Sequence, residues 1–176
     1  MKRLIGLVLA LSFLTAVPAL AAEVKLGYVD LQKALNLSES GKAAKEKIQK
    51  KVKDHEGAID ARQKELKKLK DELEKQALLL SEEARGVKER DYQQKLKEFQ
   101  RYTKDIQDEL QQQDADFTRQ ILEDLFKVIK GIGEKEGYTM ILEQSESSLL
   151  FADDKIDLTD KVIKAYDAQA KKGNGK

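Results

Sequence analysis

The chain has 176 residues, of which 40% are hydrophobic and 37% are charged, a composition that argues against one large buried core. Its 33 Lys and Arg residues nearly balance its 32 Asp and Glu residues, and both signs are interspersed. This pattern indicates solvated helix faces and excludes the basic stripe of a nucleic-acid-binding protein. There is no cysteine, so stability has to come from packing or assembly.

Residues 1–21 have the three parts of a secretory signal peptide. Two basic residues at positions 2 and 3 precede an apolar run over residues 4–17, and the small-residue motif ALA at 19–21 follows. The run is shorter than the ~20 residues that a membrane-spanning helix needs, so we favour cleavage after Ala21 over an uncleaved anchor. The expected mature protein is exported, and losing two positive charges changes its formal charge from +1 to −1.

The stretch VKLGYVDLQKAL, residues 24–35, predicts a strand followed by a short helix. Val24, Leu26 and Tyr28 recur at every second position, which is the period of a half-buried strand. Asp30 is expected to cap the helix, which continues to Leu35.

A long amphipathic helix of the coiled-coil kind is predicted from about residue 40 to residue 80, because heptad-phase positions alternate at spacings of four and three. Polar residues interrupt the pattern three times, so this seam is expected to be marginal on its own. The positions are Ile48, Val52, His55, Ile59, Arg62, Leu66, Leu69, Leu73, Gln76 and Leu80.

The segment LLLSEEARGVKER, residues 78–90, predicts the tip of a helical hairpin near residues 78–87. Ser81 is expected to cap a new helix with Glu82 and Glu83 in its first turn, and Gly86 loosens the join. One continuous helix is the alternative, because neither a serine nor one glycine compels a turn.

A second helix with the same alternation is predicted after the tip, and after residue 117 its spacing approaches that of a straight helix. The glycines Gly131, Gly133 and Gly137 are expected to end it. The positions are Tyr92, Leu96, Phe99, Thr103, Ile106, Leu110, Gln113 and Phe117, then Ile121, Leu125, Val128 and Ile132.

Two more strands and a helix are predicted after these glycines. YTMILE at 138–143 and SLLFA at 148–152 form the strands, with the polar QSES as a hairpin loop between them. The last helix lies in DDKIDLTDKVIKAYD, residues 153–167, with an apolar side formed by Leu158, Val162, Ile163 and Tyr166.

These elements predict an α+β protein that is mostly α. Residues 22–39 and 134–176 form a β-containing body, and residues 40–133 form a hairpin arm. Three strands and two short helices are too few for independent stability without disulfides, so the body is expected to oligomerise. The expected oligomerisation residues are Val24, Leu26, Tyr28, Tyr138, Met140, Leu142, Leu149 and Phe151.

No motif predicts an enzyme, a metal site or a cofactor site. His55 has no second histidine or cysteine to complete a metal site, so it is interpreted as heptad filler. GIGEKEG at 131–137 follows a helix and lacks the spacing of a phosphate-binding loop. The paired carboxylates, such as Asp153 and Asp154, have no neighbouring base or nucleophile and are interpreted as surface.

Two terminal blocks carry a resemblance to a known family. KLGYVDLQKALNLSESGKAAKEKI at 25–48 and GYTMILEQSESSLLFADDKIDLTDKVIKAYD at 137–167, with LSEEAR at the tip, resemble the Skp/OmpH family of periplasmic chaperones. The resemblance implies a homotrimer with a β-barrel-like body and three helical arms around a cavity. It also implies that the protein holds unfolded outer-membrane β-barrel proteins in the periplasm without ATP.

Charge separates this chain from its best-known relatives, which are strongly basic. The mature chain is nearly neutral, so the binding of lipid or lipopolysaccharide does not carry over. A structural or adaptor coiled-coil protein of the cell envelope is the alternative function, because the arms alone match any coiled coil.

The residues expected to contact a client lie on the arm. Leu78, Leu79 and Leu80 cannot all face one seam, so they either contact a client at the tip or pack the end of the hairpin. Phe99 and Tyr102 are further candidates, and seam packing is the alternative for both.

Overall fold

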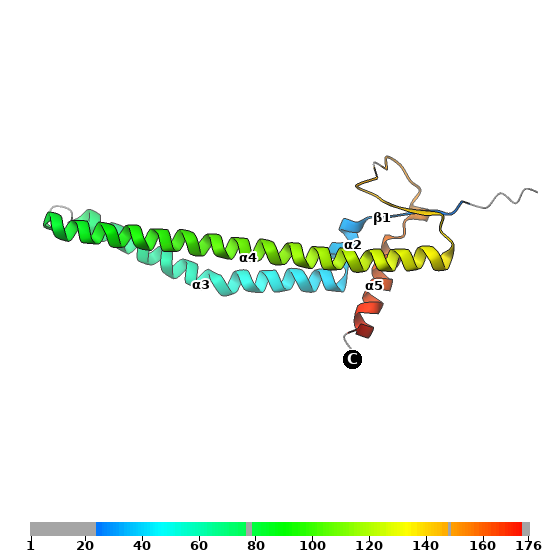
Figure 1. Ribbon diagram of the computed structural model, residues 1–176, viewed down its shortest axis with the longest axis horizontal. Coiled ribbons are helices and arrows are strands. Elements are labelled where there is room, and N and C mark those ends of the chain that lie inside the picture. Colours follow the sequence, from blue (N-terminus) through cyan, green and yellow to red (C-terminus); the bar gives the residue numbers. More distant parts are fainter. Residues whose placement is uncertain (1–23, 77–78, 148, 174–176) are drawn as a thin grey trace, which may run out of the picture.

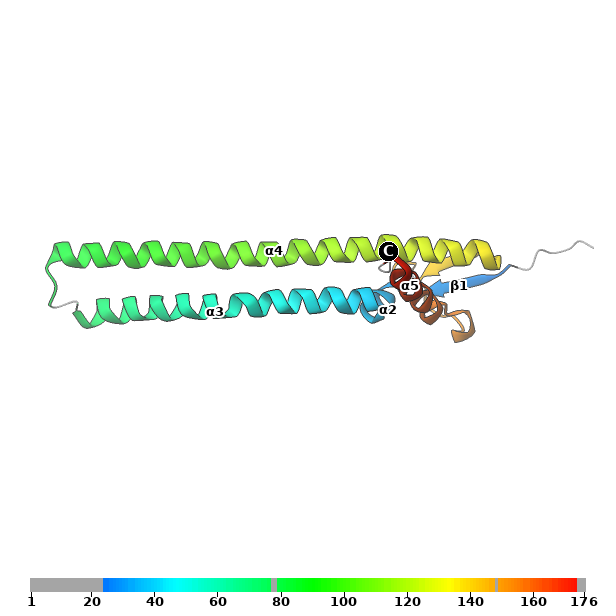
Figure 2. The same cartoon turned by 90° about the horizontal axis from the view of Figure 1, so that it is seen from below.

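The computed structural model describes residues 24–76, 79–147 and 149–173, so the expected signal peptide at 1–21 and the candidate Leu78 lie outside the described residues. A long pair of helices projects from a small body that contains both strands (Figure 1, Figure 2). From here on, the arm means residues 39–76 and 79–120, and the body means the other described residues. These bounds differ from the predicted ones, which placed residues 121–133 in the arm. The predicted class, α+β and mostly α, is confirmed. Among the described residues, no helix is apolar enough over a sufficient length to cross a membrane.

The arm is built from α3 (Glu39–Gln76) and the first part of α4 (Glu82–Glu136), which lie side by side in both views. At 1.5 Å per residue these helices are about 57 Å and about 82 Å long. Ser81 caps α4, and its hydroxyl accepts a hydrogen bond from the Ala84 N–H at 3.3 Å. The hairpin is therefore confirmed, and the alternative of one continuous helix is wrong.

The seam between α3 and α4 follows the predicted heptad positions with two exceptions, Val52 and Thr103, which are both exposed. Leu66 and Ile106 are buried, and most other predicted positions are half-buried. Thr103 is exposed instead, and its hydroxyl donates a hydrogen bond to the Phe99 carbonyl oxygen at 2.9 Å. The neighbouring Tyr102 is the half-buried residue at this level, because its larger ring finds partners on α3.

The two ends of the chain meet in a parallel pair of strands. β1 (Leu26–Val29) pairs with β2 (Met140–Glu143), with Gly27 opposite Ile141. The N-terminal strand thus finds its partner beyond the arm, as predicted. Helix α2 (Leu31–Leu37) follows β1, and its cap Asp30 accepts a hydrogen bond from the Lys33 N–H at 2.7 Å.

The prediction of a third strand in a hairpin with β2 is wrong for the described part of residues 148–152, because residues 149–153 form no strand. The second edge of β1 instead contacts the chain just before the last helix. Tyr28 forms an isolated bridge with Asp157, and the Leu158 N–H donates to the Tyr28 carbonyl oxygen at 2.9 Å. The 149–153 segment pairs with no strand among the described residues and leads into a short helical turn, η1 (Asp154–Ile156).

The long helix α4 continues through two of the glycines that were expected to end it. Gly131 and Gly133 lie within the helix, and Gly137 caps it with a φ of 70°. A glycine inside a helix costs only about 1 kcal/mol. Val128 packs in the core on the same stretch, which is enough to keep the helix intact.

The body core lies where α2, α4 and α5 (Thr159–Gly173) meet β1. Two hydrogen bonds also join α5 to the start of α2 and to the start of α3. The Thr159 hydroxyl accepts from the N–H of Asp30, the cap of α2, at 3.0 Å, and the Asp167 carboxylate accepts from the N–H of Glu39, the first residue of α3, at 2.9 Å. The core includes residues of α4 from Ile121 onward, although the body was predicted to resume only at residue 134. Its buried members are Val29, Ala34, Ile121, Leu125, Val128, Leu158, Val162 and Tyr166.

Candidate functional site

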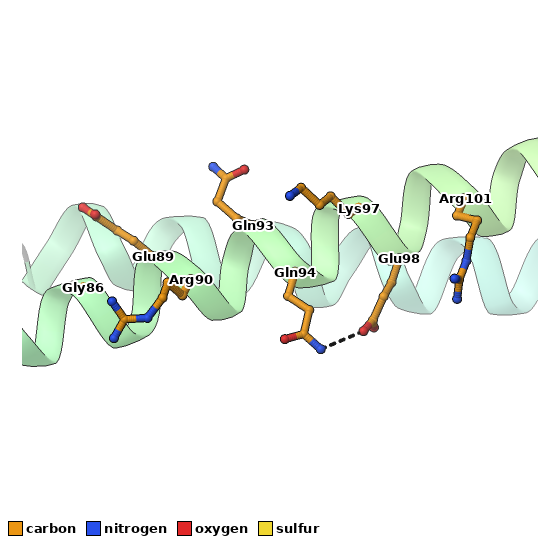
Figure 3. A pocket seen from close by; sticks show the side chains of 8 residues that line it. All are labelled: Gly86, Glu89, Arg90, Gln93, Gln94, Lys97, Glu98 and Arg101. Carbon is orange, nitrogen blue, oxygen red and sulfur yellow. Dashed lines mark hydrogen bonds between the residues drawn. The ribbon is translucent and has the colours of Figure 1, made fainter.

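The described residues form shallow depressions along the arm, and two more enclosed depressions of about 520 and 370 Å³ lie at its base, where α3 and α4 meet α5 and α2. The most pronounced depression, of about 940 Å³, follows the outer surface of α4. Figure 3 shows that its side chains diverge: Gln93 and Lys97 point to one side, and Gln94 points to the other. Three cations and two carboxylates are interspersed along it, so it presents no strongly charged site. The lining residues are Gly86, Glu89, Arg90, Gln93, Gln94, Lys97, Glu98 and Arg101.

Three polar side chains meet in the middle of the seam. The His55 Nδ1 lies 3.2 Å from the Tyr102 hydroxyl, and their rings pack edge to face at 73°. The Arg62 guanidinium carbon lies 4.3 Å from the centre of the Tyr102 ring. This cation–π contact and the hydrogen bond satisfy polar groups that interrupt the heptad pattern. Tyr102, a predicted client residue, is thus held in the seam, and no cluster of metal-binding side chains occurs in the described part of the chain.

One side of the seam carries a regular series of ion pairs between α3 and α4, which we call the ion-pair flank. Lys51 lies 2.5 Å from Glu109, and the hydrogen bond from Lys51 lowers the pKa of the Glu109 carboxyl. The next pairs are Glu65 with Lys95 at 3.3 Å and Glu72 with Lys88 at 3.2 Å. The ion-paired residues of each helix are spaced at multiples of seven residues. Tyr102 lies seven residues from both Lys95 and Glu109, so it occupies the one position of this α4 series that has no ion pair.

The other side of the seam differs in chemistry, and we call it the open flank. There the exposed Thr103 and the half-buried Phe99 line a shallow groove of about 450 Å³. The charges in this groove neutralise each other, because Lys104 lies 2.6 Å from Asp108. Its remaining polar side chains are the exposed amides Gln100 and Gln107. Phe99, a predicted client residue, is therefore accessible from this side.

The tip of the arm exposes a large apolar side chain. Leu79 is 85% exposed, whereas Leu80 is half-buried. Leu79 is therefore the more accessible of the two, and its contact with a client stays a prediction.

The body residues predicted to oligomerise divide into two groups. Tyr28 is buried inside the single chain, and Tyr138, Leu142 and Leu149 are half-buried. The remaining four are exposed, with Phe151 at 87%. The exposed four are Val24, Leu26, Met140 and Phe151.

Five exposed apolar residues are absent from the predicted site residues: Leu37, Val52, Val87, Phe126 and Leu150. Leu150 is 98% exposed, and the signal for it was three consecutive apolar residues, which cannot all face one side of a strand. Phe126 is also exposed, and the signal was its place off the stripe formed by Leu125 and Val128.

Comparisons with known proteins agree along nearly the whole chain. A model of the family described as outer membrane protein (OmpH-like) matches residues 25–166. A Skp-like protein of Pseudomonas aeruginosa is 24% identical over 163 residues, which are 93% of this chain and 96% of that protein. An uncharacterized protein of Aquifex aeolicus is 24% identical over 156 residues, covering 89% of this chain and 94% of its own length.

A solved structure shares the fold. It is that of a candidate OmpH-like outer membrane chaperone from Caulobacter crescentus CB15, with a TM-score of 0.73 at 18% identity, covering 84% of this chain and 86% of that chain. Because the family model spans most of the sequence, from residue 25 to residue 166, this protein belongs to the OmpH-like outer membrane protein family.

Proposed function

We propose that this protein is an ATP-independent holdase chaperone of the periplasm that keeps unfolded outer-membrane β-barrel proteins from aggregating. Membership of the OmpH-like family supports a chaperone role, and so does the similarity to a Skp-like protein. The observation that carries the proposal is the long two-helix arm, which exposes Leu79 at its tip and the groove beside Phe99 along its side.

The arms need a common base, and we propose that three copies of the body provide it. Leu150 and Phe151 are almost fully exposed, and the described part of the chain contains no strand that pairs with the outer edge of β2. Exposed apolar side chains beside an unpaired strand edge favour association with other chains. Three arms leaving one assembled body would then enclose a cavity.

The chemistry of the arm suits an unfolded client. An unfolded barrel protein exposes alternating apolar side chains and unpaired backbone groups, which aggregate readily. An arm with sparse apolar groups among neutralised charges offers many weak contacts, whose combined affinity is large although each one dissociates easily. Release then requires no nucleotide, and the proposal involves no catalysis.

The location and the ligands follow from the N-terminal sequence and the charge. The expected signal peptide at residues 1–21 supports export to the periplasm. The near-neutral mature chain argues against direct attraction to anionic lipid or lipopolysaccharide. The proposed partners are therefore unfolded proteins and other copies of this chain.

The test is suppression of aggregation. An outer-membrane barrel protein is diluted from urea into buffer with increasing amounts of the mature protein, and light scattering is followed. The proposal predicts that scattering is abolished at stoichiometric amounts of trimer. Unchanged scattering at every excess would refute the holdase and favour an adaptor coiled coil that binds one folded partner.

A further inference from the structure

The two sides of the arm seam offer different chemistry to a partner. On the ion-pair flank, charged side chains of α3 and α4 are occupied with each other at 2.5 to 3.3 Å. Each such contact already satisfies a cation and a carboxylate, so this flank has few groups left for a ligand. The open flank has no interhelical ion pair among the described residues.

Helix geometry places a row of glutamines on the open flank. Gln93, Gln100 and Gln107 recur every seven residues along α4. They lie two residues before Lys95, Tyr102 and Glu109 of the ion-pair flank, which is about 200° round the helix. All three side chains are exposed and make no hydrogen bond within the described part of the chain. On α3, the exposed Val52 lies about 100° round from Lys51, toward the same open side.

We propose that the open flank, formed by Val52, Phe99, Gln100, Thr103 and Gln107, is the face of the arm that binds an extended segment of unfolded polypeptide. This inference rests on the proposed holdase function and names the surface that performs it.

The groups on this flank match an extended backbone. A glutamine amide carries N–H donors and a carbonyl acceptor, the same kinds of group as a peptide bond, so it pairs with unpaired backbone groups without selecting a sequence. The Phe99 ring supplies an apolar contact beside these amides. Successive glutamines are about 10 Å apart along α4, which is about three residues of an extended chain.

Charge decides between classes of partner. The ion pair between Lys104 and Asp108, at 2.6 Å, leaves the groove without net charge. Nucleic acids and anionic lipids need unpaired cations, which the groove does not offer. An uncharged stretch of alternating apolar residues, as in a barrel strand, is the partner that fits.

The test uses a photo-crosslinking residue, p-benzoylphenylalanine, placed at one position at a time in the full mature protein. Gln100 and Gln107 probe the open flank. Gln94 and Gln112 are matched controls, because they are exposed glutamines of the same helix about 120° and 140° round from the first two. The probe is a small outer-membrane barrel protein diluted from urea.

Crosslinking to the client several-fold stronger at Gln100 and Gln107 than at Gln94 and Gln112 supports the inference. Equal or reversed yields, with unmodified protein still suppressing aggregation, would overturn the flank assignment and leave the holdase standing. Crosslinks between protomers from Gln100 and Gln107 without client would mean that a second copy covers this flank, which also overturns it. Failure of the unmodified protein to suppress aggregation would remove both proposals.

A second comparison needs no crosslinker. The double substitution Gln100→Glu with Gln107→Glu adds two charges to the open flank, and Gln94→Glu with Gln112→Glu adds them to the outer face. We expect several-fold weaker client binding for the first pair and unchanged binding for the second, measured by fluorescence titration. Equal effects of the two pairs would contradict the inference.

Discussion

At the residue scale, the join between body and arm depends on one glycine. A β-carbon on Gly41 would overlap the carbonyl oxygen of Leu35, because the start of α3 crosses the end of α2 there. The buried Ser38 lies in the same crossing, where its hydroxyl donates to the Leu35 carbonyl oxygen and accepts from the Gly41 N–H, both at 3.2 Å. Gly57, in the same helix, would place a β-carbon in open space.

We therefore expect alanine substitutions at these two glycines to change the free energy of unfolding in opposite directions. Gly41→Ala should lower the free energy of unfolding by about 1–3 kcal/mol, since a backbone atom has to move. Gly57→Ala should raise it by about 0.5–1 kcal/mol through helix propensity alone. Urea denaturation at one protein concentration measures both, and a tolerated alanine at Gly41 would contradict the described crossing.

A second prediction at the residue scale concerns the hydroxyl group of Tyr102. Tyr102→Phe removes the hydrogen bond to His55 and keeps the ring under Arg62, so the free energy of unfolding should fall by about 0.5–1 kcal/mol. Tyr92→Phe is the control, because the Tyr92 hydroxyl has no hydrogen bond among the described residues, and a change below about 0.5 kcal/mol is expected. An equal effect of the two substitutions would show that the His55 bond contributes nothing.

At the element scale, the features that depend on neighbouring residues were predictable. The heptad positions give both arm helices, and Asp30 and Ser81 cap the helices where they were expected to do so. The exchange of Thr103 for Tyr102 in the seam was not predictable from spacing, because it depends on partners that α3 supplies across the hairpin.

The third strand failed for a related reason. SLLFA has the composition of a strand, but a strand forms only where a ladder partner exists, and the part of the chain that the structure describes provides none for residues 149–153. The open flank also escaped prediction. Its character follows from which side of the seam the ion pairs occupy, and this requires the register of α3 against α4.

One contact between elements predicts a pH dependence. Glu136 at the end of α4 accepts a hydrogen bond from Lys161 of α5. This bond lowers the pKa of Glu136 below 4.5, against a smaller opposing effect of burial, and raises the pKa of Lys161 above 10.5. The stabilisation that the Glu136 carboxylate contributes is complete above pH 4.5 and is lost as the pH falls from there through the lowered pKa of the folded state. The stabilisation that Lys161 contributes is complete below pH 10.5 and is lost as the pH rises through its raised pKa.

Glu136→Gln should therefore destabilise the protein at neutral pH, and the difference from the wild type should shrink at a pH well below 4.5. Glu134→Gln is the control, since Glu134 is exposed and lies 3.8 Å from Lys130 on the same helix. Urea midpoints at the two pH values measure the effect. A gap for Glu136→Gln that does not change with pH would contradict the role of this pair.

At the scale of the whole molecule, the body of one chain leaves two large apolar side chains almost fully uncovered. Leu150 and Phe151 are 98% and 87% exposed, and both lie in the segment between β2 and η1. A monomer would present these side chains to water, so the proposed trimer accounts for a surface that the single chain leaves unexplained.

Phe151→Asp should therefore dissociate the assembly, because a carboxylate would be buried in an apolar contact. Leu79→Asp places the same charge on an equally exposed apolar residue at the tip, and it should leave the molar mass unchanged. Light scattering on a size-exclusion column distinguishes the two variants. An unchanged mass for Phe151→Asp would exclude this residue from the interface.

The molar mass of the mature protein, measured alone and with client, tests whether the assembled arms hold one unfolded client. We predict the mass of three mature chains alone and an increase by one client after an unfolded outer-membrane barrel protein is diluted into the sample. A monomer or dimer whose mass does not change on adding the client would contradict the account.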